Sequence, residues 1–218
     1  MIFGSISYLN LLPFQTYLKK RVSSTQQKQI IRWNRAVPSK INHKLKVGRV
    51  NSAFISSIHS IKYNCTDLGI VADGAVHSVF LLEGESQEDR ASASSNMLAK
   101  VLGLEGEVII GDRALKYYLD GGEGLDLALE WKRKNKLPFV FARLCYSKRG
   151  KKIAKLSKGF NPKAWKIPQY ILKKEAKKRR ISVSQLRWYL KFINYQISYK
   201  EKKSLKLFIK KAKEVSQS

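Results

Sequence analysis

The first fourteen residues constrain the fold of this chain more than any other stretch. Residues 2–6 are largely apolar, Asn10 forms a polar tip, and Pro13 leads into residues 14–19. That last segment suits a helix, because proline is tolerated in a first helical turn. The order predicts a strand, a loop and a helix. In an open α/β sheet ligands bind at the carboxyl ends of strands, so we expect Asn10 to lie at a binding site.

The same succession of an apolar run and a polar end recurs twice. Residues 51–58 turn from apolar to hydroxylic at Ser56 and Ser57, and the apolar run 108–110 is followed by a glycine and Asp112. Asp112 can cap the helix that follows or face a cleft, and the sequence leaves both interpretations open. Repeated units of strand, polar turn and helix predict an α/β fold.

A serine-rich stretch precedes another predicted helix. Ser94, Ser95 and Asn96 stand directly before residues 97–102, and Gly103 predicts the end of that helix. Hydroxyl groups at a helix start commonly serve as caps. The free N–H groups and the positive end of the helix dipole also make such a start an anion site, so both interpretations stay open.

The other apolar runs predict the remaining secondary structure. We expect strands over residues 29–33, 67–72, 76–82 and 137–142. Helices are expected over 39–48, with Ser39 as N-cap and Gly48 as the stop, and over 125–134. The acidic segment 83–90 is a candidate domain boundary, and the strand at 137–142 is a candidate return crossing between two lobes.

The last third of the chain is expected to be entirely helical. Pro168 fits the first turn of one helix, and a capping box at Ser198 to Glu201 begins the last one. Between them, four apolar residues predict one continuous helical stripe: Leu186, Leu190, Ile193 and Ile197. These apolar positions indicate a core and carry no chemistry.

The net charge of +27 suggests a polyanion partner, so its distribution matters. Most of the excess of lysine and arginine over acidic residues lies in residues 139–218, between the apolar positions of the predicted helices. A solvated basic face explains this pattern, and a polyanion-binding face is the alternative. No recognised nucleic-acid-binding motif accompanies the charge, so we expect no specific nucleic-acid partner.

Composition and cysteine usage set the remaining limits. Hydrophobic residues make up 44% of the chain, which favours a folded globule over disorder. There is no run of about 18 apolar residues and no secretory signal pattern, so we expect a cytoplasmic protein without a membrane span. Cys65 and Cys145 form no CxxC pair, and the three histidines are scattered. We therefore expect neither a structural metal site nor a disulfide framework.

Six short motifs occur in the order seen in the chorismate dehydratases of the futalosine route to menaquinone, and the chain resembles that family over residues 4–142. The motifs are Ser7–Pro13, Val37–Asn42, Phe54–Ile58, Leu68–Ile70 with Val76–Val79, Ile110–Leu115 and Leu137–Ala142. Each motif alone is weakly specific, whereas six in register are strong. The helical tail is compatible with the family but less specific.

The resemblance implies a fold like that of type 2 periplasmic binding proteins, with two α/β lobes and a ligand cleft between them. Lobe I would comprise residues 1–83 and 139–218, including the basic helical tail. Lobe II would be the small segment 84–138. This division agrees with the candidate boundaries and with the strand ends described above.

The resemblance also implies the loss of water from chorismate to give 3-[(1-carboxyvinyl)oxy]benzoate, without a metal or an organic cofactor. Aromatisation of the ring supplies the driving force, so the protein mainly has to hold a dianion and assist proton movement. Asn10 and Ser56 would be the catalytic residues. The implied substrate-binding residues are Ser57, Ser94, Ser95, Asn96 and Asp112. No residue is indicated as the general base, because His59 lies near a motif without a clear role, and a substrate carboxylate could take the proton.

The chain departs from the family pattern at two places. His77 stands where the family usually has arginine, and the stretch between Asn96 and Ile109 is shorter than usual, which predicts a trimmed second lobe. The cysteine-proline-asparagine signature of the related naphthoate synthase, the second choice among enzymes, is absent.

Two functions from other classes remain open. A non-catalytic cytosolic protein of the same fold would bind a carboxylate without changing it, and a basic nucleic-acid binder would rest on the charge alone. Neither the oligomeric state nor a role for the basic helices follows from the sequence.

Overall fold

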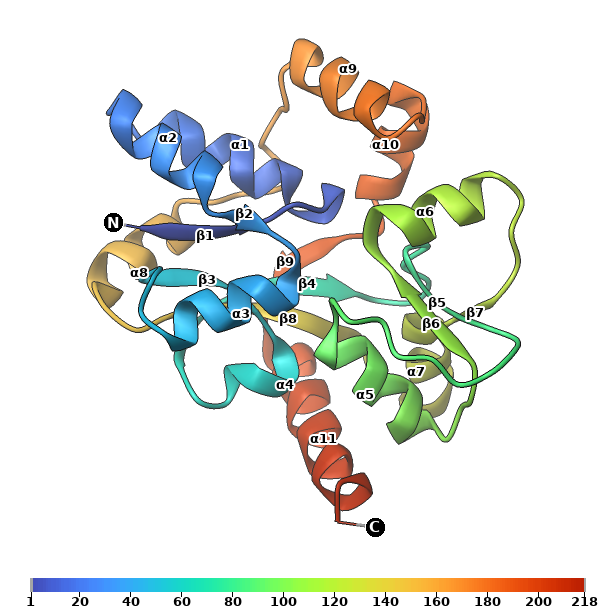
Figure 1. Ribbon diagram of the computed structural model, residues 1–218. Helices are drawn as coiled ribbons and strands as arrows, with labels where there is room; N and C mark the ends of the chain where they lie inside the picture. The colour runs from blue at the N-terminus through green and yellow to red at the C-terminus, as the bar shows by residue number, and fades with distance from the viewer. Residues whose placement is uncertain (1, 218) are drawn as a thin grey trace.

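The computed structural model describes residues 2–217, which form two β-sheets with helices around them (Figure 1). The larger sheet has six strands in the order β2-β1-β3-β8-β4-β9, and the smaller sheet has three in the order β6-β5-β7. The strands are β1 (Phe3–Ile6), β2 (Arg35–Ala36), β3 (Ser52–Ser56), β4 (Asn64–Ala72), β5 (Val79–Leu82), β6 (Glu107–Ile110), β7 (Leu125–Asp126), β8 (Phe139–Tyr146) and β9 (Asn194–Gln196).

Helices cover both sheets. In the larger sheet α1 and α2 lie on one side of β1, and α3 and α4 lie on the other, while α5, α6 and α7 surround the smaller sheet (Figure 1). The helices are η1 (Leu9–Leu11, a 3₁₀ turn), α1 (Leu12–Arg21), α2 (Thr25–Trp33), α3 (Pro38–Lys46), α4 (Ser57–Ser60), α5 (Ala93–Leu102), α6 (Gly111–Leu119), α7 (Leu127–Asn135), α8 (Gly150–Lys158), α9 (Gln169–Lys178), α10 (Val183–Leu190) and α11 (Tyr199–Val215).

The centre of the larger sheet is buried on both faces. β1 pairs in parallel with β2 and β3, whereas β8 runs antiparallel between β3 and β4. Every residue of β1 and β3 is buried, as expected for strands covered on two sides. Phe14 of α1 packs its ring against Phe54 of β3 at 5.1 Å and against Phe160 at 5.2 Å between centroids.

The predicted strand at residues 29–33 is wrong, because this segment is the second half of α2. Ser24 caps that helix by accepting a hydrogen bond from the backbone of Gln27, and only Ile31 is fully buried. A short apolar run fits a strand and a helix face equally well, and here the helix cap decides. The predicted cap of α3 is also wrong: Val37 is the N-cap and Ser39 lies within the helix, while Gly48 follows its end with φ +74° as expected.

The last third of the chain contains a strand that the sequence did not predict. α10 ends at Leu190, and β9 pairs with β4 at the edge of the larger sheet, so Ile193 and Ile197 flank a strand and do not continue a helix. The capping box that begins α11 is present, with Glu201 reaching back to Ser198.

The chain leaves the larger sheet after β4, builds the smaller sheet from β5, β6 and β7, and returns through β8. β5 therefore pairs in the smaller sheet, although the boundary expected at residue 83 would leave it in lobe I. α11 packs beside α7, where Trp131 Nε1 donates to Ser204 Oγ at 2.9 Å. The division into lobes stays a prediction, and these pairings favour a first boundary between Ala72 and Val79.

The sequence predicted no disulfide framework, but the structure contains one disulfide. Cys65 of β4 and Cys145 of β8 occupy directly paired positions and form a disulfide with an S–S distance of 2.00 Å. Their separation of 80 positions in the sequence is no recognisable spacing, because the register of two strands brings them together. Within residues 2–217, no helix is both long and apolar enough to cross a membrane.

Candidate active site

A cavity lies between the two sheets. Its polar wall comes from the loop after β1, the end of β3, the start of β5 and the first turn of α5: Tyr8, Asn10, Ser56, Ser78, Ser92 and Ser95. Ile6, Ile70 and Phe141 supply apolar surface from the larger sheet. None of the described lining residues carries a formal charge at neutral pH, so the wall binds through hydroxyl, amide and backbone groups.

Asn10 lies in this cavity at the end of the first strand. The 3₁₀ turn η1 follows β1 directly, and the backbone oxygen of Asn10 accepts a 2.6 Å hydrogen bond from Tyr195 Oη of β9. Asn10 Oδ1 is buried and has no hydrogen-bond partner among the described residues. A buried acceptor without a partner costs about 1–3 kcal/mol, so a ligand that donates to this oxygen would recover that free energy.

Ser56 also lies in the cavity, at the carboxyl end of β3. Asn42 holds it from outside the cavity: Asn42 Nδ2 donates to Ser56 Oγ at 2.8 Å, and the Ser56 N–H donates to Asn42 Oδ1 at 3.2 Å. With one lone pair occupied in this way, the Ser56 hydroxyl is left to donate its proton into the cavity.

His59 is the histidine closest to these groups. Its Nδ1 lies 3.2 Å from Asn42 Nδ2, and its side chain lines a neighbouring hollow between α3, α4 and α5. Burial lowers the pKa of His59, and the nearby charges of Lys62 and Lys46 lower it further. The neutral imidazole therefore accepts from Asn42 and supports Ser56 indirectly.

The serine-rich start of α5 divides between two roles. Ser92 is the N-cap, with its Oγ accepting from the Ser95 N–H at 3.2 Å and donating to Ser95 Oγ at 2.8 Å, and both residues line the cavity. The Ser94 hydroxyl instead forms a hydrogen bond with the Ser57 hydroxyl, with 2.9 Å between the two oxygens. Ser94 Oγ also accepts from the Ile58 N–H. Ser57 and Ser94 are thus buried in a contact between α4 and α5, outside the cavity wall.

Asn96 points away from the cavity. Its amide donates to the Asp89 backbone oxygen at 2.9 Å and accepts from the Asp89 N–H at 3.1 Å. The side chain thereby fixes the loop before α5 and lines the neighbouring hollow. Of the three residues expected to bind a carboxylate from the second lobe, only Ser95 faces the cavity.

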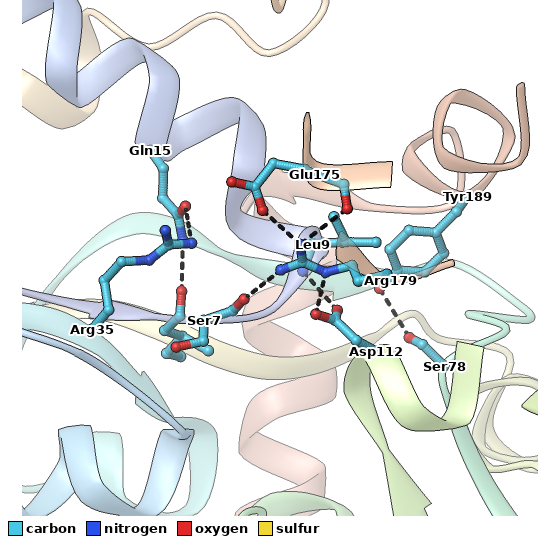
Figure 2. Close-up of polar contacts among 10 residues, drawn as sticks. Ser7, Leu9, Gln15, Arg35, Ser78, Asp112, Glu175, Arg179 and Tyr189 are labelled. Atoms are coloured by element: carbon cyan, nitrogen blue, oxygen red, sulfur yellow. Dashed lines mark hydrogen bonds and ion pairs between the residues drawn. The ribbon is translucent and has the colours of Figure 1, made fainter. Parts of the chain in front are cut away.

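Asp112 is neither a helix cap nor part of the cavity wall. The N-cap of α6 is Ile110, and the Asp112 carboxylate accepts from the Leu9 N–H at 2.9 Å and forms an ion pair with Arg179 (Figure 2). Burial raises the pKa of Asp112, while Arg179 and the Leu9 N–H oppose that rise. The neighbouring Gly111 does line the cavity, and its φ of +68° and the Tyr8 ring, 2.7 Å from an added Cβ, both require glycine there.

Tyr8, Ser78 and Ser92 are cavity residues that the sequence reasoning did not single out. Ser78 Oγ accepts from Tyr189 Oη of α10 at 3.0 Å (Figure 2), and its backbone oxygen accepts from the Gly111 N–H at 2.8 Å. Burial raises the pKa of Tyr8 well above its usual value, so the phenol keeps its proton and can donate it. Tyr8 and Ser78 belong to motifs that the sequence did mark, although their individual roles were not assigned.

His77, which departs from the family pattern, packs among aromatic rings. Its imidazole lies 4.8 Å from the rings of Tyr118 and Trp188 and 4.4 Å from that of Phe192. Burial lowers the pKa of His77 despite the attraction of Asp126. His77 therefore contributes a neutral ring to the packing of α6 against α10, where an arginine would bring a charge.

No group of three or more histidine, cysteine, aspartate or glutamate side chains arranged to hold a metal ion occurs in the described part of the chain. The cavity instead offers a buried amide, several hydroxyl groups and the N-terminus of α5, a ten-residue helix whose positive dipole end attracts anions. This set of groups can bind a small polar anion and stabilise charge that develops on its oxygens.

Two β-sheets with helices around them and a polar cavity between them are typical of proteins that share the type 2 periplasmic-binding fold. Two solved structures show this likeness. A protein of Archaeoglobus fulgidus superposes with a TM-score of 0.63 at 12% identity, covering 99% of this chain and 97% of the other. The periplasmic aliphatic sulphonate-binding protein of Escherichia coli superposes with a TM-score of 0.55 at 14% identity, covering 99% and 91%.

The particular family follows from sequence comparison. The family model described as menaquinone biosynthesis matches residues 1–105 and 92–214. A chorismate dehydratase of Campylobacter jejuni is 44% identical over 218 residues, covering 98% of both chains. The chain therefore belongs to the menaquinone-biosynthesis family that contains this dehydratase.

Proposed function

We propose that this chain is a chorismate dehydratase, a hydro-lyase that converts chorismate into 3-[(1-carboxyvinyl)oxy]benzoate and water in menaquinone biosynthesis. Family membership and 44% identity to a chorismate dehydratase support the activity. The observation on the site that carries the proposal is the unpaired, buried Oδ1 of Asn10 in a cavity with an uncharged wall. A substrate that brings its own hydroxyl donor and its own negative charges suits such a cavity.

The reaction breaks one C–H bond and one C–O bond of the chorismate ring. The leaving hydroxyl takes up a proton to form water, and the ring becomes aromatic. Because aromatisation supplies the driving force, the protein gains most by fixing the substrate in a reactive orientation and by assisting proton movement. We assign Asn10 Oδ1 to the substrate hydroxyl, which donates to it, and the hydroxyl groups of Ser56 and Ser78 to oxygens of the substrate.

The carboxylates of the substrate need neutral donors. We assign one of them to the start of α5, where the Ser95 hydroxyl lines the cavity at the positive end of the helix dipole. Tyr8, held protonated by burial, is a further donor. No carboxylate or imidazole lines the cavity among the described residues, so we propose that a carboxylate of the substrate itself takes the ring proton.

A non-catalytic protein that binds a carboxylate in the same cavity is the main alternative. The sulphonate-binding protein of Escherichia coli has the same fold, so the fold alone does not distinguish binding from turnover. Incubation of the purified protein with chorismate, followed by ultraviolet absorbance and mass spectrometry, separates the two. Formation of the aromatic product, unaffected by a chelator, supports the proposal, whereas folded protein that binds chorismate and leaves it unchanged refutes it.

A nucleic-acid-binding function finds no support in the site. The lysines of α11 lie mostly exposed, and the pair between Lys202 and Asp67 is itself largely exposed to solvent. Reversing the charges of Lys202, Lys206 and Lys210 together should therefore change solubility and salt response but not turnover. We also propose a cytoplasmic location, where a biosynthetic enzyme meets its substrate.

A further inference from the structure

We infer that Arg179 is a positioning residue for the proposed dehydration. Arg179 and Asp112 form a clamp that holds the turn carrying Asn10 and joins the two predicted lobes. This inference rests on the proposed function for its kinetic consequence only. The clamp itself is a feature of the geometry and is testable without turnover.

The clamp holds two peptide groups on either side of Tyr8 (Figure 2). Arg179 Nη2 donates to the Ser7 backbone oxygen at 2.9 Å, and Arg179 Nε donates to Asp112 Oδ2 at 2.5 Å. The other oxygen of Asp112 accepts from the Leu9 N–H at 2.9 Å. These bonds close a ring around residues 7–9, so the backbone that enters Asn10 has its conformation fixed by two side chains.

Arg179 is itself immobilised. Its Nη1 donates to the carboxylate of Glu175 at 2.5 Å and to the Glu175 backbone oxygen at 3.2 Å, and its side chain is only 9% exposed. A guanidinium group presents several donors in a rigid plane, which allows it to bridge three partners at once, whereas an ammonium group acts as a point charge. The arrangement therefore depends on arginine, and lysine is a poor substitute.

The three segments of the clamp come from distant parts of the chain. Ser7 follows β1 of the larger sheet, Asp112 lies in the first turn of α6 beside the smaller sheet, and Arg179 follows α9. Gly111, the neighbour of Asp112, lines the cavity and donates to the Ser78 backbone oxygen. The clamp thus sets the distance across the cavity between Asn10, on one lobe, and the pair of lining residues Ser78 and Gly111, on the other.

A buried ion pair is weak evidence for a stabilising role, because desolvation offsets much of the attraction. The contacts of Arg179 and Asp112 are better explained by their effect on the backbone of residues 7–9, whose conformation they fix next to Asn10. Asp112, expected from the sequence to bind substrate, thereby acts on the substrate through the backbone of Leu9.

The test compares Arg179→Lys, Asp112→Asn and the double variant with the wild type, with Arg187→Lys as control. Arg187 is exposed on the neighbouring α10, and its side chain donates to Gln169, so its change leaves the clamp intact. The first readout is amide hydrogen exchange over residues 7–12. We expect at least tenfold faster exchange there in Arg179→Lys and in the double variant, with β3 unchanged and the control like the wild type.

The second readout is chorismate turnover. We expect kcat to fall at least tenfold in both single variants with a smaller change in KM, and the double variant to lose no more than the worse single variant, because all three break the same unit. Unchanged exchange in residues 7–12, or losses of kcat that simply multiply, would overturn the inference. Should Arg179→Lys fail to fold, the kcat of Asp112→Asn decides alone. This variant keeps an acceptor for Leu9 but loses the ion pair with Arg179, and a normal kcat would overturn the inference. If the wild type shows no turnover, the proposed function fails, and the exchange experiment still judges the clamp.

Discussion

The hydroxyl of Tyr195 donates to the backbone oxygen of Asn10 at 2.6 Å, although 185 residues separate them in the chain. Tyr195 is buried in β9, the short edge strand of the larger sheet. The C-terminal third of the chain thus reaches the cavity, because Tyr189 donates to Ser78 and Tyr195 donates to Asn10, both of which line it. Arg179 contacts Ser7 and Asp112 behind the cavity wall. A segment expected to carry only core and surface residues therefore supports the site.

Replacing Tyr195 by phenylalanine should reduce turnover more than stability. The change removes one hydrogen bond, worth about 1 kcal/mol, and frees the Asn10 peptide. We expect kcat to fall about tenfold, which corresponds to about 1.4 kcal/mol, with a small decrease in Tm. Steady-state kinetics and thermal unfolding measure both effects.

Tyr17→Phe is the matched control for this change. Tyr17 is equally buried, and its hydroxyl donates to the Leu156 backbone oxygen at 3.0 Å, away from the cavity. The control should lose similar stability and keep its turnover. Equal kinetic losses in the two variants would contradict a specific role for Tyr195.

Ser78→Ala should lower turnover at least tenfold, because it removes a cavity hydroxyl that Tyr189 orients from outside. Ser60→Ala is the control, since Ser60 is buried but donates to the Ser57 backbone oxygen outside the cavity wall. The measurement is kcat together with the midpoint of urea unfolding. A Ser78→Ala enzyme with normal kcat would remove this residue from the site.

Some of the residues predicted for the site line the cavity, but the sequence did not distinguish them from predicted residues that lie outside it, and their roles stay predictions. Asn10, Ser56 and Ser95 were found because each stands at the end of a strand or at the start of a helix, and these local signals survive in the fold. Ser57 and Ser94 carry the same local signal, yet they pair with each other because α4 packs against α5. Only the tertiary structure separates a hydroxyl in the wall from one behind it.

The fold was likewise predicted where the signal is local in the sequence, and missed where it depends on residues that are distant in the chain. The α/β class was predicted correctly from runs of apolar residues and their polar ends, which are local signals. The fold resembling periplasmic binding proteins, which the resemblance to the dehydratase family implied, was also correct. The segment 29–33 and strand β9 were predicted wrongly, since short apolar runs suit either state. The bridge between Cys65 and Cys145 depends on the register of β4 against β8, which no spacing in the sequence reveals.

Reduction of the disulfide should destabilise the protein without abolishing turnover. The bridge links positions 80 residues apart, for which the chain-entropy model gives about 4.5 kcal/mol. Cys145 lies three positions along β8 from Ala142, the nearest cavity residue on that strand, so about 10 Å of strand separates them. Urea unfolding and kinetics with and without dithiothreitol measure the two effects.

The double variant Cys65→Ser, Cys145→Ser is the control for reduction and should not respond to dithiothreitol. An unfolding midpoint of the wild type that ignores the reductant would contradict a stabilising bridge. Turnover that stops on reduction while the protein stays folded would contradict the separation of the bridge from the site.

His77 should make the protein less stable below about pH 6.5. Burial lowers the pKa of His77 in the folded state from its ordinary value of 6.5, so the unfolded chain takes up the proton first as the pH falls. Stability is fully present above pH 6.5 and declines through the window below it. His77→Asn, which tolerates the observed φ of +55°, should flatten the dependence of Tm on pH between 7 and 5.

His59 provides a comparison, because burial lowers its pKa in the same direction. His59→Asn should flatten a further part of the same slope, and the effects should add because the two residues share no contact. An unaltered slope in His77→Asn would show that its imidazole is protonated as easily in the folded protein as in the unfolded chain.

Dehydration of chorismate is proposed to take place at Asn10, and turnover by Asn10 variants tests this most directly. Asn10→Ala should lower kcat by roughly 100-fold, about 3 kcal/mol of transition-state stabilisation, with little change in Tm. Asn10→Asp should be at least as damaging, because a carboxylate in the cavity repels a dianionic substrate. If both variants convert chorismate at nearly the wild-type rate and only unfold earlier, Asn10 is a turn residue and the active site lies elsewhere.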